Sequence, residues 1–263
     1  MTISGQIGFF AKSYHLLWAL IWSAIPLWPF CVLGQENSSP ATTNQLWMDY
    51  NFKYKLSDRF SLAGPIGIKT IFPRSWSRYY ISPEIRYTPP KLMLKSLQYH
   101  EELRAGIEFY YNNNFDGTNV VEVSPYQGYS LTWPNNQRLA LGHYLKLRER
   151  FQFDTEKWEK TFGLKLSYEI TFTLKFQGDI WEYGKGFYLP VSMKFYWNLI
   201  DAAVFNNVFR ITPGLGYQIS PGWKSAFLIG YNRTRNGVDE QFKTNDVIFR
   251  LRVYHSLVNK KKS

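Results

Sequence analysis

Residues 164–176, with the sequence LKLSYEITFTLKF, decide the predicted fold. Apolar or aromatic side chains occupy the even positions of this stretch, and polar or charged side chains occupy the odd positions between them. An alternation with period two indicates a β-strand that has one apolar and one polar face. Strands of globular proteins usually run about 5–6 residues. A strand of this length is typical of an outer-membrane barrel, which has lipid outside and a polar interior.

The same alternation recurs along residues 46–254 and predicts eleven strands, separated by polar turns and loops. Bacterial single-chain barrels have even strand numbers, so one strand is either missed or split in this count. Segments 91–100 and 201–207 are the candidates for a missed strand. The predicted fold class is therefore all-β, a transmembrane antiparallel up-and-down β-barrel of about 12 strands, with about 10 strands as the alternative.

The N-terminal residues 1–34 are predicted to be a secretory signal peptide, because a long apolar run fills residues 16–34. Val32 and Gly34 are small enough for the −3 and −1 positions of a cleavage site, which places cleavage between Gly34 and Gln35. An uncleaved membrane anchor is the alternative, since the apolar run is long for a signal peptide.

The rest of the chain is expected to form a single domain with short extensions. We predict a flexible N-terminal segment at 35–44, which is polar, and an outer-membrane β-barrel at 45–257. A basic C-terminal tail follows at 258–263. Together with the signal peptide, this organisation predicts localisation in a bacterial outer membrane.

Composition agrees with a barrel and argues against several other classes. The chain is 19% aromatic, with Trp 10, Tyr 19 and Phe 20, and barrels need girdles of aromatic side chains at both interfaces. A large β-sandwich core is the alternative reason for that content. Mean hydropathy is −0.32, which gives no support for helical spans after the N-terminus. The one cysteine, Cys31, lies in the predicted signal, so disulfides, a cysteine nucleophile and thiolate metal sites are not expected.

The formal net charge is +11, and Lys12 is the only charged residue before Gln35. A basic chain can bind nucleic acid, but here Lys and Arg are spread through the alternating strands without a recognition motif. Attraction to anionic head groups or lipopolysaccharide phosphates is the better interpretation. The predicted partners are outer-membrane lipids, lipopolysaccharide and the barrel-assembly machinery, with no nucleic acid, and the chain is expected to be a monomer.

Several short motifs occur along the chain in a fixed order. They are Trp47, residues 83–87 (PEIRY), Gly106 with Glu108, Glu122 with Gln127, residues 143–151 (HYLKLRERF), residues 210–217 (RITPGLGY), and Gly230 with Tyr231. In order and spacing these motifs resemble an uncharacterised family of bacterial outer-membrane β-barrels, domain of unknown function 2490. The resemblance covers nearly all of the mature chain and implies no assigned reaction. The strand before Gln127 tends in that family to carry Glu and Arg two apart, and Ser124 stands here in place of the Arg.

If the apolar faces meet lipid, the polar faces bring many charged side chains into the barrel interior. Opposite charges on neighbouring strands can then pair across the ladder. One interpretation is a structural network of Arg–Glu pairs that fills the lumen, and the other is a basic lumen that admits or binds an anion. The residues predicted to form this lumen charge network are Glu84, Arg86, Arg104, Glu108, Glu122, Lys146, Arg148, Arg150, Glu169, Arg210, Arg250 and Arg252.

Within this network, Lys146, Arg148 and Arg150 lie on one strand face and repel each other unless acids intervene. Glu122 on the preceding strand and Glu169 on the following strand are predicted to neutralise this row. We expect this group of three cations and two acids to close part of the lumen.

His143 and Glu149 fall on the apolar face of their strand. An acid that faces lipid is costly at the membrane midplane but not at the interface, so Glu149 is expected near a rim or shifted to the lumen by a bulge. An enzyme would need a nucleophile, a base and an orienting group placed together, and no motif of this kind or metal-ligand spacing occurs. We predict no catalytic residues, no metal and no cofactor.

The predicted function is that of a non-enzymatic barrel, either a structural protein or a narrow channel for small polar or anionic solutes. An outer-membrane enzyme that acts on lipid or lipopolysaccharide is the alternative. A catalytic group of Ser, His and Asn or Asp at the outer rim would favour the enzyme, and a lumen open from end to end would favour the channel.

Overall fold

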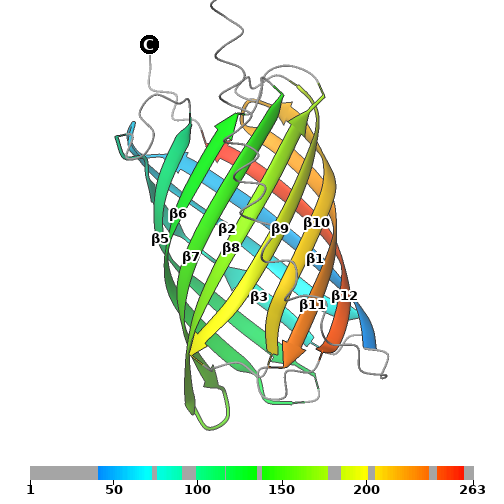
Figure 1. The fold of residues 1–263 in the computed structure, drawn as a ribbon. Helices are drawn as coiled ribbons and strands as arrows, with labels where there is room; N and C mark the ends of the chain where they lie inside the picture. Colours follow the sequence, from blue (N-terminus) through cyan, green and yellow to red (C-terminus); the bar gives the residue numbers. More distant parts are fainter. Residues whose placement is uncertain are drawn as a thin grey trace, which may run out of the picture. The chain divides into compact units, whose positions relative to one another are not determined.

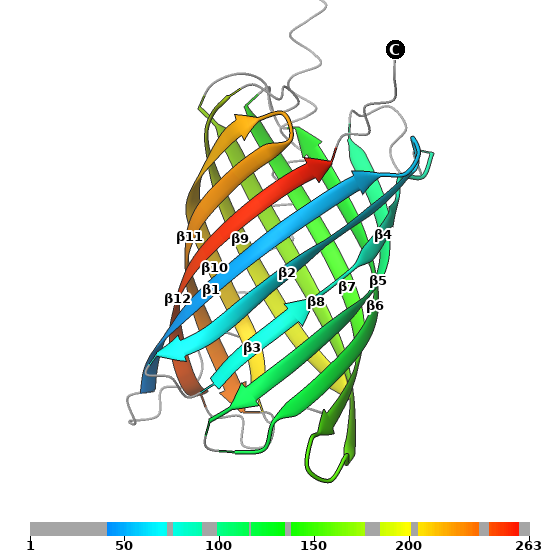
Figure 2. The same ribbon diagram turned by 180° about the vertical axis from the view of Figure 1, so that it is seen from behind.

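The computed structural model describes residues 41–72, 76–90, 99–115, 117–134, 138–176, 185–200, 205–236 and 242–257. Every helix or strand assigned among them is a β-strand, and the strands form a single sheet that closes into a barrel (Figures 1 and 2). No helix in this part of the chain is long and apolar enough to cross a membrane. The predicted signal peptide, most of the predicted flexible segment and the basic tail lie outside the described residues.

Most strands have 13 to 16 residues, as the length of the alternating segments predicts. They are β1 (Ala41–Lys55), β2 (Phe60–Phe72), β3 (Trp76–Ile81), β4 (Glu84–Tyr87), β5 (His100–Asn114), β6 (Val120–Pro134), β7 (Leu139–Asp154), β8 (Lys160–Lys175), β9 (Gly186–Ile200), β10 (Phe205–Ser220), β11 (Trp223–Asn236) and β12 (Phe242–Leu257).

Residues 79–88 carry the alternation of a single strand, but Ser82 and Pro83 divide it into β3 and β4. Both pieces lie between β2 and β5, so they share one position in the barrel wall. Proline has no N–H to give to a ladder, but the break remains hydrogen bonded. The Ser82 N–H donates to the Pro65 carbonyl at 2.9 Å, and the Ile107 N–H donates to the Pro83 carbonyl at 3.1 Å. The twelve strands therefore occupy eleven positions around the barrel.

This arrangement corrects the expectation of an antiparallel barrel with an even number of strands. Neighbouring strands pair antiparallel along the chain, but β1 pairs with β12 in parallel, from Ala41 opposite Thr244 to Tyr54 opposite Leu257. An odd number of up-and-down positions brings the first and last strands together in the same direction, so the seam has to be parallel. Of the two segments suggested as missed strands, residues 205–207 begin β10 and His100 begins β5, while residues 91–98 and 201–204 lie outside the described part.

The side chains are distributed as the alternation predicts, with the apolar faces outside and the polar faces inside. In β8, Phe172 and Leu174 are exposed, whereas Lys165 and Ser167 are buried. Across the barrel, Met48 and Leu145 are 47% and 45% exposed, while Glu122 is 1% exposed. Burial of charge beneath an apolar outer surface is the reverse of the distribution in water-soluble domains.

Pairs of aromatic side chains lie on the outer surface toward both ends of the barrel. We call the end that holds the start of β1 end A, and the end that holds residues 56–59, where β1 turns into β2, end B. The outer aromatic pairs near end A are Phe151–Phe162 (ring centroids 5.2 Å apart) and Phe195–Phe209 (5.3 Å). Those near end B are Phe60–Tyr87 (4.9 Å), Phe187–Tyr217 (4.8 Å) and Trp223–His255 (3.8 Å).

Candidate functional site

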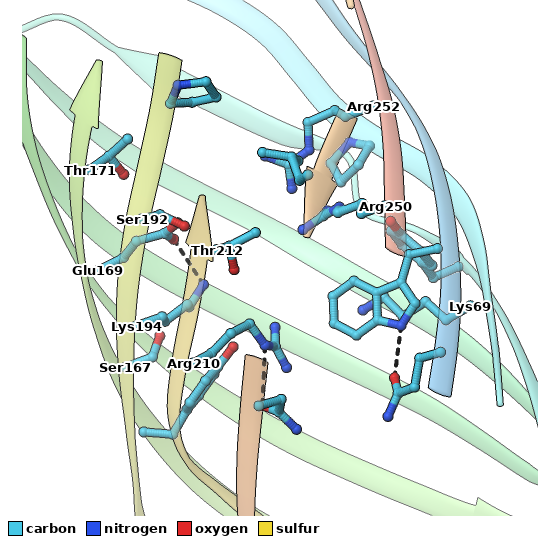
Figure 3. A pocket seen from close by; sticks show the side chains of 18 of the residues that line it. Lys69, Ser167, Glu169, Thr171, Ser192, Lys194, Arg210, Thr212, Arg250 and Arg252 are labelled. Carbon is cyan, nitrogen blue, oxygen red and sulfur yellow. Dashed lines mark hydrogen bonds and ion pairs between the residues drawn. The ribbon is translucent and has the colours of Figure 1, made fainter. Parts of the chain in front are cut away.

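The inward-facing side chains surround a cavity of about 960 Å³ inside the barrel, part of which Figure 3 shows. Its wall carries far more basic than acidic groups. The acids are Glu108, Glu169 and Asp246. The cations are Lys69, Arg78, Lys146, Arg148, Arg150, Lys165, Lys175, Lys194, Arg210, Lys224, Arg250 and Arg252. An excess of one sign of charge on low-dielectric walls focuses the potential inside a cavity.

On the β5–β7 wall, Glu108 neutralises two members of the predicted cationic row. The carboxylate of Glu108 lies on β5, where it contacts Lys146 and accepts a hydrogen bond of 2.5 Å from Arg148, both on β7. The Tyr110 hydroxyl donates a further hydrogen bond of 2.7 Å to it. The contacts of Glu108 with Lys146 and Arg148 pass over β6 through the interior, because β5 and β7 are not neighbours in the sheet.

Glu122 on β6 forms the most buried ion pair of this wall. Both carboxylate oxygens accept from Arg150, at 3.0 and 2.7 Å, and one also accepts from Gln152 at 2.8 Å. The hydroxyl of Ser124, which stands where the family carries an arginine, donates to the same carboxylate at 2.8 Å. Arg150 on the next strand thus supplies the guanidinium that position 124 lacks, and the contact between Glu122 and the row agrees with the prediction.

The prediction for Glu169 is wrong in its partner. Glu169 does not neutralise the row on β7; it pairs with Lys194 on β9 at 3.1 Å. Lys194 lies directly opposite Glu169 in the β8–β9 ladder, whereas the residue opposite it on β7 is Tyr144. The nearest ladder neighbour therefore takes the carboxylate, and Glu108 replaces it beside Lys146 and Arg148.

The parallel seam is held by an acid that the predicted network omits. Asp49 on β1 accepts hydrogen bonds from Arg250 at 2.7 Å and Arg252 at 2.8 Å, both on β12, and from the Tyr80 hydroxyl at 3.0 Å. The side chain of Asp49 is fully buried. Its position on the polar face of the first strand was a usable signal in the sequence.

A further group of ion pairs lies near end B. Glu84 accepts from Arg86 at 2.6 Å and from the Tyr126 hydroxyl at 2.8 Å. Arg104 lies 2.8 Å from Glu102, an acid that sequence reasoning missed because the predicted strand began one residue later. The structure thus distributes the predicted network over several separate clusters.

His143 and Glu149 remain on the outer face. The register of β7 runs without a shift on both sides, so no bulge turns Glu149 inward, and its side chain is exposed. His143 Nδ1 lies 2.6 Å from the Tyr168 hydroxyl, and His255 Nδ1 lies 2.7 Å from the Tyr50 hydroxyl. Neither histidine contacts a serine within the described residues, and these residues contain no group of three or more potential metal ligands.

The sequence matches the model of a family described as a protein of unknown function, DUF2490, over residues 44–254. The chain belongs to this family. The match confirms the resemblance found in the sequence motifs. It begins in β1 and ends in β12, so membership covers the whole barrel together with its parallel seam. No curated protein matches the sequence.

Proposed function

We propose that this member of DUF2490 is a β-barrel of the bacterial outer membrane whose cationic interior binds or passes small anions. The observation that supports this most is the inverted distribution of side chains, with exposed Met48 and Leu145 outside and buried Glu122 inside. Soluble monomers rarely expose contiguous apolar patches larger than a few hundred Å². A barrel in a membrane requires an outer surface of this kind.

Strand length and the outer aromatic pairs support the same proposal. β1 has 15 residues, and at about 3.3 Å per residue and a tilt of about 40° it would rise roughly 38 Å, enough to cross an apolar band of about 25 Å. Tyr, Trp and Phe side chains toward ends A and B would then lie at the two interfaces, where amphipathic rings are favoured. The proposed partners are outer-membrane lipids, lipopolysaccharide and the barrel-assembly machinery, and the proposed state is a monomer.

The excess of cations over acids around the cavity supports anions as the solutes. A sealed structural barrel is the second candidate, and the buried contacts of Glu122 and Asp49 favour it, because each fixes side chains from different strands across the interior. The two candidates differ in whether the cavity communicates with both ends.

Charge substitutions on the two faces of β8 test membrane insertion. Leu166→Arg places a cation on the outer face near the middle of β8 and should block assembly, since Arg at the midplane of the lipid face costs about 2–4 kcal/mol. Thr171→Arg and Thr173→Arg face the cavity and should assemble as the parent does. Migration of unboiled against boiled protein in gels reports assembly, and equal assembly of all three variants would contradict insertion.

Chloride release from liposomes tests the function of the interior. Liposomes that contain the refolded protein should release trapped chloride faster than protein-free liposomes, and release of potassium should be slower than that of chloride. A sealed structural barrel predicts no release of either ion although the protein is inserted. Faster release of potassium would contradict an anionic solute.

A further inference from the structure

The inner wall formed by β8, β9 and β10 holds basic side chains that its own acids do not balance. Lys194 on β9 lies directly opposite Glu169 on β8 and directly opposite Arg210 on β10. Glu169 is therefore on one side of Lys194 and a second cation on the other. β9 and β10 contain no Asp or Glu in their described strands. Like charges directly opposite each other destabilise a sheet, so the gap between Lys194 and Arg210 favours a bound anion.

Arg210 reaches a polar neighbour but no carboxylate. Its Nε donates to Asn232 on β11 at 3.2 Å, and Asn232 donates in turn to Asp246 at 2.7 Å. Within the described residues Lys165 makes no ion pair either, although it is only 7% exposed. The wall thus presents buried Lys165 and half-buried Arg210 beside Lys194, which pairs with a single acid, Glu169.

Aromatic rings hold these cations in place. Lys165 Nζ lies 4.6 Å from the centroid of the Tyr196 ring, and Arg210 Cζ lies 5.5 Å from the same ring. Arg210 also lies 4.6 Å from the Trp47 ring of β1, and Lys69 lies 4.2 Å from it. A cation–aromatic contact offsets part of the cost of removing a cation from water but leaves its positive charge uncompensated.

Neutral hydrogen-bond donors lie on the next rung of the same wall. Thr171, Ser192 and Thr212 are opposite one another across β8, β9 and β10, one rung above Glu169, Lys194 and Arg210. All three hydroxyls line the cavity and are drawn beside the two cations in Figure 3. A hydroxyl can donate to an anion oxygen, and a planar guanidinium binds oxyanions with two parallel hydrogen bonds.

We propose that Lys194, Arg210, Ser192 and Thr212 form a binding site for a phosphate-type oxyanion, which we call the oxyanion seat. Lys165 lies farther along the same wall, opposite Asn198, and adds its charge without contacting the ligand. The inference rests on the proposed anion-binding interior and specifies its ligand. Chloride is attracted by the positive charge of the seat but has no separate oxygen atoms for its several hydrogen-bond donors. A tetrahedral oxyanion with two negative charges is attracted by the charge and also accepts hydrogen bonds from several donors. Inorganic phosphate and the phosphate group of a larger solute share this chemistry.

Calorimetric titration of the refolded barrel in detergent with inorganic phosphate tests the seat. The parent should bind phosphate at one saturable site. Arg210→Gln should weaken binding at least about tenfold, and Lys165→Gln, which acts only through charge, should weaken it less. Within the described residues neither change removes the partner of an acid. Thr212→Val removes one hydroxyl with little change in shape and should weaken binding a few fold, so the test stands if a charge variant fails to fold.

Lys224→Gln is the matched control, because Lys224 lines the same cavity near end B but contacts the rings of Tyr188 and Tyr254 and not the seat. It should change phosphate affinity less than about twofold. Equal weakening by Lys224→Gln and Arg210→Gln would show a diffuse positive potential and overturn the seat. Absence of saturable phosphate binding in the parent would overturn it as well.

Competing anions distinguish the source of the ligand and separate this proposal from the channel. Displacement of phosphate by glycerol phosphate supports a seat that accepts the phosphate group of a solute, and failure of displacement supports a seat for the free ion. Displacement by an equal concentration of chloride would contradict an oxyanion site. Phosphate binding without chloride release from liposomes would leave the seat standing while the channel fails, and chloride release without phosphate binding would do the reverse.

Discussion

The β5–β7 wall and the β8–β10 wall face the same cavity but treat charge differently. On the first wall, Glu122 and Arg150 are 1% and 8% exposed, and the carboxylate has no oxygen without a partner. On the second, Glu169 and Lys194 are 26% and 23% exposed, and Arg210 beside them pairs with no acid in the described part of the chain. Buried ion pairs in which every carboxylate oxygen has a partner stabilise the arrangement of strands. Cations at the cavity surface in excess of the acids can interact with a ligand. The comparison separates structural charge from functional charge.

The largest effect is expected from Glu122→Gln on the first wall. The change leaves Arg150 buried without its acid, and loss of one partner of a buried pair costs about 3–5 kcal/mol. Urea unfolding in detergent should show a loss of this size. A loss below about 1 kcal/mol would mean that water screens the pair and that the first wall is not a dry ionic cluster.

Glu108→Gln should destabilise the same wall by a smaller amount. Lys146 and Arg148 are 12% and 17% exposed, so the cavity can hydrate them in part when the carboxylate is lost. We expect about 2–3 kcal/mol in the same unfolding measurement. A larger loss of unfolding free energy than for Glu122→Gln would contradict the inference that the more buried pair contributes more to stability.

Glu169→Gln on the second wall should cost less than about 1 kcal/mol, because a partly hydrated pair contributes little. The same change should strengthen phosphate binding, since it removes the negative charge that pairs with Lys194. Urea unfolding and phosphate titration of one preparation measure both quantities. Weaker phosphate binding would show that Glu169 positions Lys194 for the ligand, and would contradict a purely repulsive role of this carboxylate.

Lys165→Met should have the smallest effect on stability, near zero or slightly favourable. Lys165 has no ion pair to lose, and a methionine fills similar space beside Tyr196 without a buried charge. Urea unfolding in the absence of phosphate measures the change. Destabilisation comparable to that of Glu122→Gln would show that the second wall is structural as well.

The sequence predicted the division between inner and outer faces because alternation requires no knowledge of the neighbouring strands. It also predicted most of the inward charges, such as Glu108, Arg210 and Arg250. The pairing of those charges depends on register, and register is set by bulges and turns that a pattern of period two does not contain. For this reason the partner of Glu169 was misassigned.

The seam was hidden for a related reason. Residues 79–88 carry the alternation of one strand. In the structure the strand is interrupted at Ser82 and Pro83, which separate β3 from β4. The parallel pairing of β1 with β12 follows from the number of positions in the closed barrel, which no local segment reveals. Glu102 was missed near the start of β5, where the boundary of an alternation is least defined. Asp49 lies in the middle of β1 and was left out although its face was predicted.

The most direct test of the account is to locate a tetrahedral oxyanion inside the protein. Selenate scatters anomalously and has the shape and charge of a phosphate-type ion, so diffraction from crystals grown with selenate gives its position. We predict an anomalous peak between Lys194 and Arg210, next to Ser192 and Thr212, and none beside Glu122 and Arg150. A peak beside the β5–β7 wall, or an interior without any peak at saturating selenate, would contradict the separation of the two walls.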